Sequence, residues 1–353
     1  MQKRERHLSA FAMIAGFIFD NIFFDRIDVW QTHLWLASYA LSCFIAISWL
    51  HFIEARVERG RPRPRWRVIL PITTQFALGG FWSAFVIFYG HSAVLSASWP
   101  FLLFLFLIFL GSEYFSQYHE RLVFTSVLFF FAIYSYAIFA VPIYTGTLGT
   151  LTFIESGVVA IGIFALFTIV LRMLGRERFL ADIWRIRFGA ACVFVIINIF
   201  YFTNILPPLP LSATASGVYH AVWHIPGAYL GASEEESWQV RYLGFTPTIH
   251  ITPGEALSAY SEIFAPTALT TTVVHRWQRY SPEEKQWITR AVITYPIVGG
   301  RDGGYRGYST VRVGEAGEWR VNVETIDGRL IARLPFTAVV VTVSPLQQTV
   351  TLE

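Results

Sequence analysis

The glycine-rich segment at residues 299–309 has the residue types best suited to binding a ligand. Its glycines permit positive φ and close backbone approach, and arginine guanidinium groups bind carboxylates or phosphates through paired N–H donors. Its candidate contact residues are Arg301, Asp302, Tyr305, Arg306 and Tyr308. We expect a loop that binds an anionic or sugar-containing polymer. The alternative is a structural hairpin in which Asp302 pairs with an arginine and the tyrosines cover the core.

His275 and Trp277 precede this loop in the sequence and are predicted to lie on the same face of one strand. Side chains alternate between the two faces of a strand, so residues two apart point the same way. Together they would provide an aromatic platform for a sugar ring beside the loop. The alternative is that both pack between two sheets, where buried tryptophan is common.

The histidines are weaker candidates. His220 and His224 are four residues apart, a spacing that would place two metal ligands on one helix face. His250 and the glutamates at 234–236 could supply further ligands. However, the chain has no His-Glu-x-x-His motif, and Pro226 would limit such a helix. We therefore predict neither a metal site nor a bound cofactor.

The sequence offers no recognisable catalytic constellation. It has no Gly-x-Ser-x-Gly turn of the kind that exposes a nucleophilic serine, and both cysteines, Cys43 and Cys192, lie in apolar runs. Glu262, Glu318 and Glu324 are available carboxylates, but their spacing does not select an acid–base pair. No catalytic residue is predicted, and an enzymatic function is left open.

Four polar side chains fall near the ends of apolar runs in the N-terminal part: Asp20, Asn21, Glu155 and Asn198. Ionisable residues inside a membrane are costly and often functional. Together these residues could form a polar pocket that binds a lipid headgroup or a cation. The alternative is that both carboxylates lie close enough to the membrane surface to be solvated.

Apolar runs long enough to span a membrane dominate the first 206 residues. Charged residues make up only 14% of the chain, whereas a soluble domain carries about 25%. A spanning helix needs roughly 20 mostly apolar residues. Such runs lie at about 8–26, 31–53, 68–89, 99–116, 122–144, 152–174 and 188–206. Residues 1–206 are therefore predicted to form a domain of about seven transmembrane helices.

The positions of the basic residues predict the orientation of these helices. Fifteen of the sixteen Lys and Arg residues before position 210 lie at the N-terminus, at 56–67, at Arg121 and at 172–187. These are alternate gaps between the apolar runs, and basic loops stay on the cytoplasmic side. We expect a bacterial inner-membrane protein with a cytoplasmic N-terminus and a periplasmic C-terminal part. Because this charge would face lipid headgroups, no nucleic-acid partner is predicted.

The sequence changes character after residue 206. The prolines at 207–210 would end the last helix, and residues 207–240 are expected to form an interfacial helix or linker. From about residue 241, apolar and polar residues alternate as in half-buried strands, and Asp327-Gly328 is typical of a hairpin turn. About seven short strands would make residues 241–353 a periplasmic immunoglobulin-like β-sandwich.

Three motifs occur in a recognisable order: Val-His-Arg-Trp at 274–277, Ile-Val-Gly-Gly-Arg-Asp-Gly-Gly-Tyr-Arg-Gly-Tyr-Ser at 297–309, and Gly-Glu-Trp-Arg-Val at 317–321. With these motifs, residues 255–340 resemble the bacterial domain of unknown function 2914, which ends envelope proteins of proteobacteria. The helical part resembles the membrane domain that accompanies it in some members. The resemblance implies an architecture and an envelope location, but no reaction.

These observations lead us to expect a non-enzymatic membrane protein of the envelope whose periplasmic sandwich binds a protein or a glycan. Membrane lipids would surround its helices, and a membrane-protein complex is a further candidate partner. Two alternatives stay open. The chain could be an accessory subunit of a larger membrane complex, or a lipid-modifying or lipid-carrying protein with an outer-leaflet carboxylate site.

Overall fold

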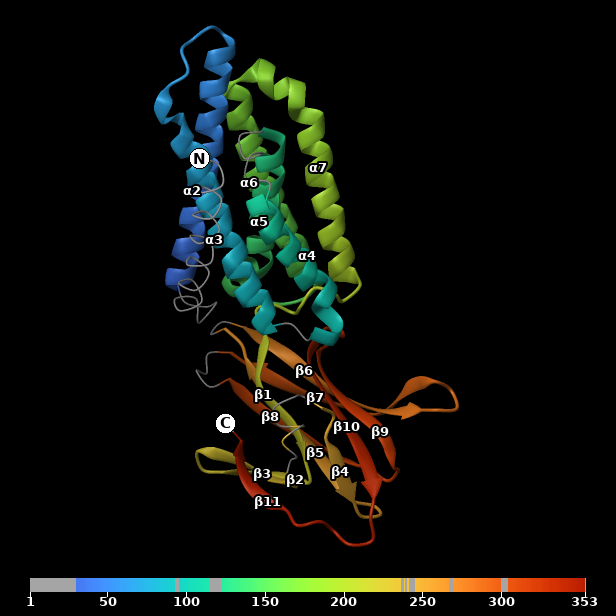
Figure 1. Ribbon diagram of the computed structural model, residues 1–353. Helices are drawn as coiled ribbons and strands as arrows, with labels where there is room; N and C mark the ends of the chain where they lie inside the picture. The colour runs from blue at the N-terminus through green and yellow to red at the C-terminus, as the bar shows by residue number, and fades with distance from the viewer. Residues whose placement is uncertain are drawn as a thin grey trace. The chain divides into compact units, whose positions relative to one another are not determined.

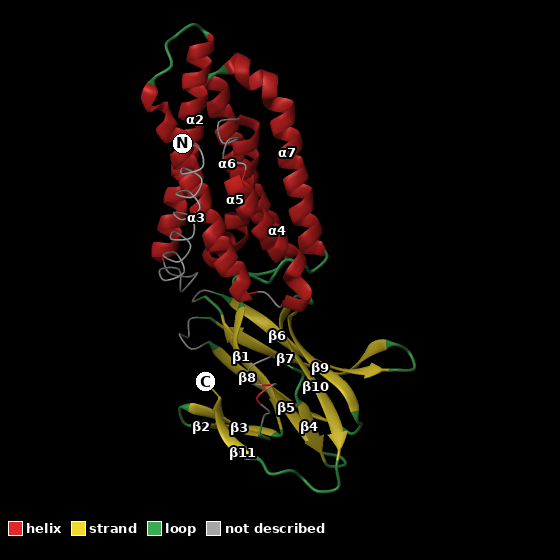
Figure 2. Cartoon of the chain, in the orientation of Figure 1, coloured by secondary structure: helices red, strands yellow, loops and turns green. Residues whose placement is uncertain are grey.

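The computed structural model describes residues 30–92, 95–114, 122–235, 238, 240, 245–266, 269–299 and 304–352. The chain divides into two compact units. The helical unit comprises Met1–His91 and Ser98–Leu209, and the β unit comprises Ser92–Ala97 and Pro210–Glu353. Figure 2 shows the change from helices to strands along the chain.

Six α-helices are described (Figure 1). They are α2 (Trp30–Glu58), α3 (Ile69–Ser92), α4 (Leu95–Tyr114), α5 (Leu122–Thr145), α6 (Thr150–Leu174) and α7 (Arg176–Phe202), with a short 3-10 helix, η1 (Arg65–Val68), before α3. Five helical segments among the described residues are long and apolar enough to cross a membrane, and they include every helix except α4. Within the described residues, α4 contributes an apolar stretch at Ser98–Ile108. The predicted span at 8–26 lies outside the described residues.

Burial differs sharply among the helices. In α5, 72% of the most apolar stretch is buried, and the helix packs against α2, α6 and α7. Aromatic rings pack along α5: the rings of Phe129 and Phe167, on α6, are 4.8 Å apart, and Trp82, on α3, stacks on Phe131 at 5.2 Å. Only 22% and 17% of the corresponding stretches of α6 and α7 are buried. These two helices therefore leave most of their apolar surface exposed.

The basic stretch at 172–187, expected as a loop, is helical apart from one residue. α6 ends at Leu174, Gly175 intervenes, and α7 begins at Arg176. A Cβ on Gly175 would lie 2.7 Å from His51 Nε2 and 2.8 Å from the Cβ of Ala55. Glycine therefore allows this tight junction to approach α2 closely, and the expectation of a loop was wrong.

Eleven strands are described in the β unit. They are β1 (Ser212–Tyr219), β2 (Ala221–Ile225), β3 (Ala228–Ser233), β4 (Thr248–Ile251), β5 (Ala256–Phe264), β6 (Thr270–Ser281), β7 (Gln286–Val298), β8 (Tyr305–Arg312), β9 (Gly317–Thr325), β10 (Leu330–Val340) and β11 (Gln348–Leu352). They form a five-stranded sheet, β4-β10-β9-β6-β7, and two three-stranded sheets, β1-β5-β8 and β11-β3-β2. The described pairs are antiparallel except β4 with β10, which is parallel.

The five-stranded sheet and the β1-β5-β8 sheet face each other across a packed core. Trp277 and Trp319 both pack their rings against Phe336, and all three side chains are nearly fully buried. Trp277 Nε1 reaches across to Ser309 Oγ on β8, to which it donates a hydrogen bond of 3.0 Å. The alternation along β9 and β10 thus turns the apolar residues inward, as the sequence predicted.

The segment 207–240 does not form the expected helix, because it contains β1, β2 and β3. β2 and β3 pair with β11, and this third sheet packs on β5. Its buried contacts are Val222, Tyr260 and Leu352. Gly227 turns the chain between β2 and β3 with a φ of 90°, and glycine inside a helix is unfavourable.

Two hairpin turns are present in the structure, and the first is the one that the sequence predicted. Asp327-Gly328 lies between β9 and β10; Gly328 has a φ of 80°, and its N–H donates to Thr325 O at 2.9 Å. Residues 282–285 join β6 to β7. Tight hairpin turns favour residues that accept positive φ. These turns help to set the register of the strands that carry the candidate sites.

Candidate functional site

The predicted binding loop lies partly outside the described residues, which do not include Arg301 and Asp302. The other candidates, all on β8, are Tyr305, Arg306 and Tyr308. Tyr308 is 43% exposed, and its ring lies 6.3 Å from that of Tyr229 in an edge-on arrangement. Tyr305 is half-buried. Of the described candidates in the loop, Tyr308 therefore offers the most accessible ring.

Arg306 is engaged within the protein. Its Nε donates to Glu262 Oε2 at 2.9 Å, and the side chain of Glu262 is only 6% exposed. The same carboxylate accepts hydrogen bonds from Tyr260 and Thr214, each at 3.1 Å. Burial and the nearby Glu262 charge raise the pKa of Tyr260, so its hydroxyl stays a donor. These contacts favour the structural alternative for Arg306, since an unpaired buried carboxylate would be costly.

His275 and Trp277 are fully buried, so neither offers the exposed ring that a sugar platform requires. His275 Nε2 lies 2.9 Å from Ser261 Oγ and 3.0 Å from Tyr295 OH. Its Nδ1 lies 2.8 Å from Ser309 Oγ, which also accepts the Trp277 indole N–H. We call these five residues the His275 clasp, because they connect the two facing sheets. Their positions match the core-packing alternative.

The Ser261–His275 contact in the clasp has the spacing of a nucleophile and its base, but a substrate could not reach it. Both side chains are fully buried. Burial lowers the pKa of His275 to about 4, so the ring is neutral at neutral pH, and burial raises the pKa of Tyr295. A neutral, fully hydrogen-bonded network of this kind stabilises a unique core arrangement.

A second polar cluster joins residues from different strands. His220 Nδ1 lies 2.6 Å from Glu255 Oε1, and His220 Nε2 lies 3.0 Å from Glu234 Oε1. His250 Nδ1 lies 2.7 Å from the other oxygen of Glu234. The cluster ties the end of β3 to β4 and to the start of β5.

Hydrogen bonding keeps these glutamates ionised. Burial acts to raise the pKa of Glu234, but hydrogen bonds from His250 and His220 outweigh it and lower that pKa. The pKa of Glu255 is lowered in the same way, against burial, by hydrogen bonds from Thr252 and His220. His224 is absent from these contacts and packs on Tyr229 instead. In the described part of the chain, no group of three or more His, Cys, Asp or Glu could hold a metal ion.

The outer face of the five-stranded sheet carries a network that the sequence did not single out. We call it the arginine face; its residues are Arg276, Gln278, Trp287, Arg320, Asn322, Glu324 and Arg333. Arg276 Nε forms an ion pair with Glu324 Oε2 at 2.9 Å. Asn322 Oδ1 accepts a hydrogen bond from Arg333 Nε at 3.0 Å, and Asn322 Nδ2 donates to Glu324 Oε1 at 3.1 Å. In the sequence, only the alternation of apolar and polar residues along β9 and β10 indicated that these side chains lie on one face.

Arg320 lies at the other side of this network. Its Nε donates to Gln278 Oε1 at 2.8 Å, and its guanidinium carbon lies 4.2 Å from the centre of the Trp287 ring, a cation–π contact. Burial lowers the pKa of Arg320 to about 10, and the neighbouring charge of Arg333 adds to this effect. The nearby charge of Glu324 acts in the opposite direction, and the group stays protonated at neutral pH.

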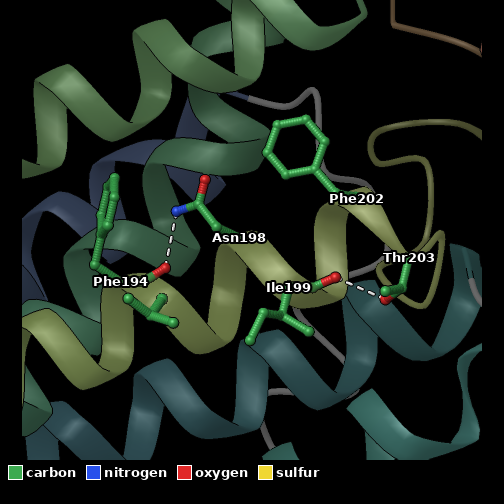
Figure 3. Close-up of a pocket in the computed structure, with 6 residues that line it drawn as sticks. Phe194, Asn198, Ile199, Phe202 and Thr203 are labelled. Atoms are coloured by element: carbon green, nitrogen blue, oxygen red, sulfur yellow. Dashed lines mark hydrogen bonds between the residues drawn. The ribbon is translucent and has the colours of Figure 1, made fainter.

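Two of the four residues of the predicted polar pocket, Glu155 and Asn198, lie in the described part of the helical unit. Asp20 and Asn21 lie outside the described residues, and Glu155 is exposed on α6. Asn198 is half-buried on α7, where its Nδ2 donates to Tyr134 OH at 3.2 Å and to Phe194 O at 2.8 Å. Asn198 lines an open groove of about 330 Å³, and Figure 3 shows its side chain with the dashed hydrogen bond to Phe194. The groove is lined by Phe194, Val195, Asn198, Ile199, Phe202 and Thr203.

A buried carboxylate connects the two basic stretches at 56–67 and 172–187. From the sequence, these stretches served only to predict the orientation of the helices in the membrane. Glu54, on α2, is 11% exposed in its side chain and binds Arg67 at 2.8 Å and Arg63 at 3.0 Å. Arg178, near the start of α7, lies 3.8 Å from the same carboxylate and 3.0 Å from Glu58. The arginines of 56–67 and of 172–187 therefore lie at the same end of the helical unit.

Comparison with known proteins identifies the C-terminal part only. The sequence model of the family described as "Protein of unknown function (DUF2914)" matches residues 270–338. This confirms the resemblance seen in the sequence, and the matched residues include the whole arginine face, His275 and Trp277. No curated protein matches the chain.

Among the solved structures that match the chain, one is described here, and its similarity is weak. It is Pseudomonas fluorescens alkylpurine DNA glycosylase AlkC bound to DNA containing an abasic site analog. The sequence identity is 9%, the TM-score is 0.24, and the alignment covers 86% of this chain and 97% of that chain. A TM-score of this size carries no argument about fold or function.

Proposed function

We propose that this chain is a non-enzymatic integral membrane protein of the bacterial inner membrane whose β unit binds a protein or glycan partner in the periplasm. The observation that carries the membrane part is the exposed apolar surface of α6 and α7, of which Val158 is 63% exposed and Leu166 57%. A soluble bundle would turn such a surface inward. In a bilayer this apolar surface would contact lipid tails. The predicted span at 8–26 would bring the number of transmembrane helices to seven.

The arrangement of charge supports the proposed orientation. Arg63, Arg67 and Arg178 meet around Glu54, so the two basic stretches lie at one end of the helices. That end would face the cytoplasm, since basic segments are retained there. With seven spans and a cytoplasmic N-terminus, the β unit would enter the periplasm.

Strand order supports an immunoglobulin-like sandwich for the β unit. In one sheet, the order β1-β5-β8 corresponds to strands A, B and E of a variable-type domain. In the other, β10-β9-β6-β7 corresponds to strands G, F, C and C′. Trp277 then takes the place of the buried tryptophan on strand C. Such domains commonly serve as binding modules. The buried Ser261–His275 pair gives no reason to propose a reaction.

A reporter fusion tests the orientation. We would fuse either alkaline phosphatase, which is active only in the periplasm, or green fluorescent protein, which fluoresces in the cytosol, after Glu353. Phosphatase activity without fluorescence is expected. The reverse result would reject the periplasmic assignment and, with it, an envelope partner.

A binding comparison tests the proposed interaction. Purified full-length protein would be compared with an Arg301→Ala, Arg306→Ala variant in a pulldown from solubilised envelopes and on a glycan array. Loss of a partner by the variant, with its melting temperature kept, would assign the contact to the loop. Equal binding by both proteins would remove the loop from consideration.

The groove at Asn198 favours a second candidate function, that of a lipid carrier. An open apolar groove with one amide could hold an acyl chain beside a polar linkage. Asn198→Leu should then reduce the lipid that co-purifies with the protein, measured by mass spectrometry, relative to Cys192→Ser on the same helix. The exposed Phe202 and Leu166 also suit an accessory subunit, which extraction in mild detergent would recover as a complex.

A further inference from the structure

The end of the helical unit that holds Glu54 is strongly basic. We call residues 54–67 and 172–187 the basic end; together they contain eleven arginines and four acidic residues, a formal charge of +7. Glu54 brings the two segments together through its ion pairs with Arg67 and Arg178. Even if every acidic side chain were paired with an arginine, seven positive charges would remain. The excess therefore does not depend on which arginines form ion pairs.

The arginines of the basic end divide by exposure. The side chains of Arg67 and Arg178, which contact Glu54, are 18% and 22% exposed. They fasten α2, η1 and α7 to one another. The other nine arginines are exposed, among them Arg65 and Arg187. The inner ion pairs therefore build a scaffold whose outer layer is basic.

Both segments place arginines directly before a predicted membrane-spanning run. Arg65 precedes the apolar run at 68–89, and Arg185 and Arg187 precede the run at 188–206. In the proposed orientation both runs begin at the cytoplasmic surface of the membrane. These guanidinium groups would then lie at the depth of the headgroups that border the hydrocarbon core.

Exposed apolar and aromatic side chains lie next to these arginines. Trp66 and Val68, in η1, are at least half exposed, and Trp184 and Phe188, on α7, are 74% and 73% exposed. The guanidinium carbon of Arg187 lies 5.5 Å from the centre of the Trp184 ring, a cation–π contact. Tryptophan rings favour the headgroup level of a membrane. The basic end therefore presents apolar surface beside its guanidinium groups.

An anionic phospholipid complements both kinds of surface. Guanidinium groups bind phosphate through two parallel N–H donors, and acyl chains would cover the apolar side chains. A soluble phosphate compound would leave the same side chains in contact with water. The ion pair of Arg185 with Asp182 leaves room for such a contact, because the Arg185 side chain is 76% exposed and exposed ion pairs are weak.

We propose that the basic end binds anionic phospholipids of the cytoplasmic leaflet. Their phosphate groups contact Arg65 beside Trp66, and Arg185 and Arg187 beside Trp184. This inference rests on the membrane orientation in the proposed function. It goes beyond that function by naming the class of lipid that the helical unit selects and the residues that select it.

Native mass spectrometry of the full-length protein in detergent micelles tests the proposal, with phosphatidylglycerol and phosphatidylcholine of the same acyl chains as probes. Wild type should bind phosphatidylglycerol at least about tenfold more tightly, because each basic residue near anionic lipid contributes about fivefold. The double variant Arg65→Gln, Arg187→Gln should reduce this preference at least about fivefold. The control variant Arg290→Gln, Arg312→Gln removes the same charge from two exposed arginines of the β unit and should stay within about twofold of wild type.

Two measurements on wild type keep the proposal testable even if the double variant unfolds. Raising ammonium acetate from about 50 mM to about 500 mM should reduce the preference for phosphatidylglycerol severalfold, because salt screens exposed charges. Glycerophosphoglycerol, the same headgroup without acyl chains, should compete only weakly. A preference that is absent or independent of salt would overturn the proposal, as would equal losses in the two double variants. Competition by glycerophosphoglycerol as strong as that of the whole lipid would also overturn it, since the ligand would then be a soluble phosphate.

Failure of this inference can be distinguished from failure of the proposed function. If wild type shows no preference for phosphatidylglycerol but the reporter after Glu353 lies in the periplasm, the lipid assignment is wrong and the proposed orientation stands. If the reporter lies in the cytosol, the proposed orientation fails, and the leaflet named here fails with it. The lipid measurement on purified protein is independent of that result.

Discussion

Lowering the pH from 7 to 5 should weaken the packing of the two facing sheets through His275. Burial holds the pKa of this ring at about 4, below its ordinary value of 6.5. Between those two values the unfolded chain binds a proton at His275 and the folded chain does not. Protons therefore favour the unfolded state, so the stability that is complete above pH 6.5 is lost progressively as the pH falls towards 4.

The magnitude follows from the pKa difference. Each pH unit inside this window changes the free energy of unfolding by about 1.4 kcal/mol, so the fall from pH 6.5 to pH 5 removes about 2 kcal/mol. No reduction for solvent screening is needed, because the ring is fully buried. Glu234 and Glu255 add little above pH 5, because their pKa values are lowered from 4.5.

Hydrogen exchange measured by mass spectrometry on peptides from β6 can follow this change in the full-length protein. The opening free energy would be obtained at pH 7 and pH 5 after correction for the intrinsic exchange rate. His275→Asn should lose most of the pH dependence, although its stability at pH 7 falls. His224→Asn, the matched change at an exposed histidine, should keep the wild-type dependence.

Two results would refute this reasoning. One is a β6 opening free energy in wild type that changes by less than about 0.5 kcal/mol between the two pH values. The other is a His275→Asn variant with the full wild-type pH dependence. The first result would mean that His275 accepts its proton in the folded state despite its burial. The second would mean that other groups carry the pH dependence.

Three further changes test the packing. Trp277→Ala should lower the free energy of unfolding of the β unit by about 3–5 kcal/mol in a denaturant titration, because a fully buried indole leaves a cavity. Gly299→Ala should lower the melting temperature, because a Cβ there would collide with a backbone carbonyl oxygen, whereas Gly314→Ala meets open space and should change stability by less than about 0.5 kcal/mol. Glu54→Gln should destabilise the helical unit by about 1–3 kcal/mol in thermal melts followed by circular dichroism, whereas Glu58→Gln, at a more exposed carboxylate, should have a smaller effect.

Features that depend on local sequence were predicted well. The six apolar runs within the described residues form helices near the expected positions, because length and hydropathy are read directly from the chain. Asp327-Gly328 formed its turn, since few residue pairs accept the required backbone angles. The prediction for residues 207–240 was wrong because their mixture of aromatic and small residues has no clear period. These residues form strands only by pairing with β5 and β11.

Features that depend on register could not be predicted. Arg276, Asn322 and Arg333 form one row only because three strands pair with specific offsets, and those offsets are set by the core on the other side of the sheet. Sequence alternation marked Asn322 and Arg333 as outward-facing, but not as neighbours of Arg276. In the same way, His275 and Trp277 were predicted to be an exposed binding pair. Both are buried, because a second sheet covers them.

The His275 clasp also has a consequence for how this module matures. Many sandwiches fasten their two sheets with a disulfide and so depend on an oxidising compartment. Here the fastening is made of a neutral imidazole, two serines and two aromatic side chains, and both cysteines of the chain lie before residue 210. The module needs no oxidase to close, and thiol reductants should leave it intact. Its vulnerability is to acid instead.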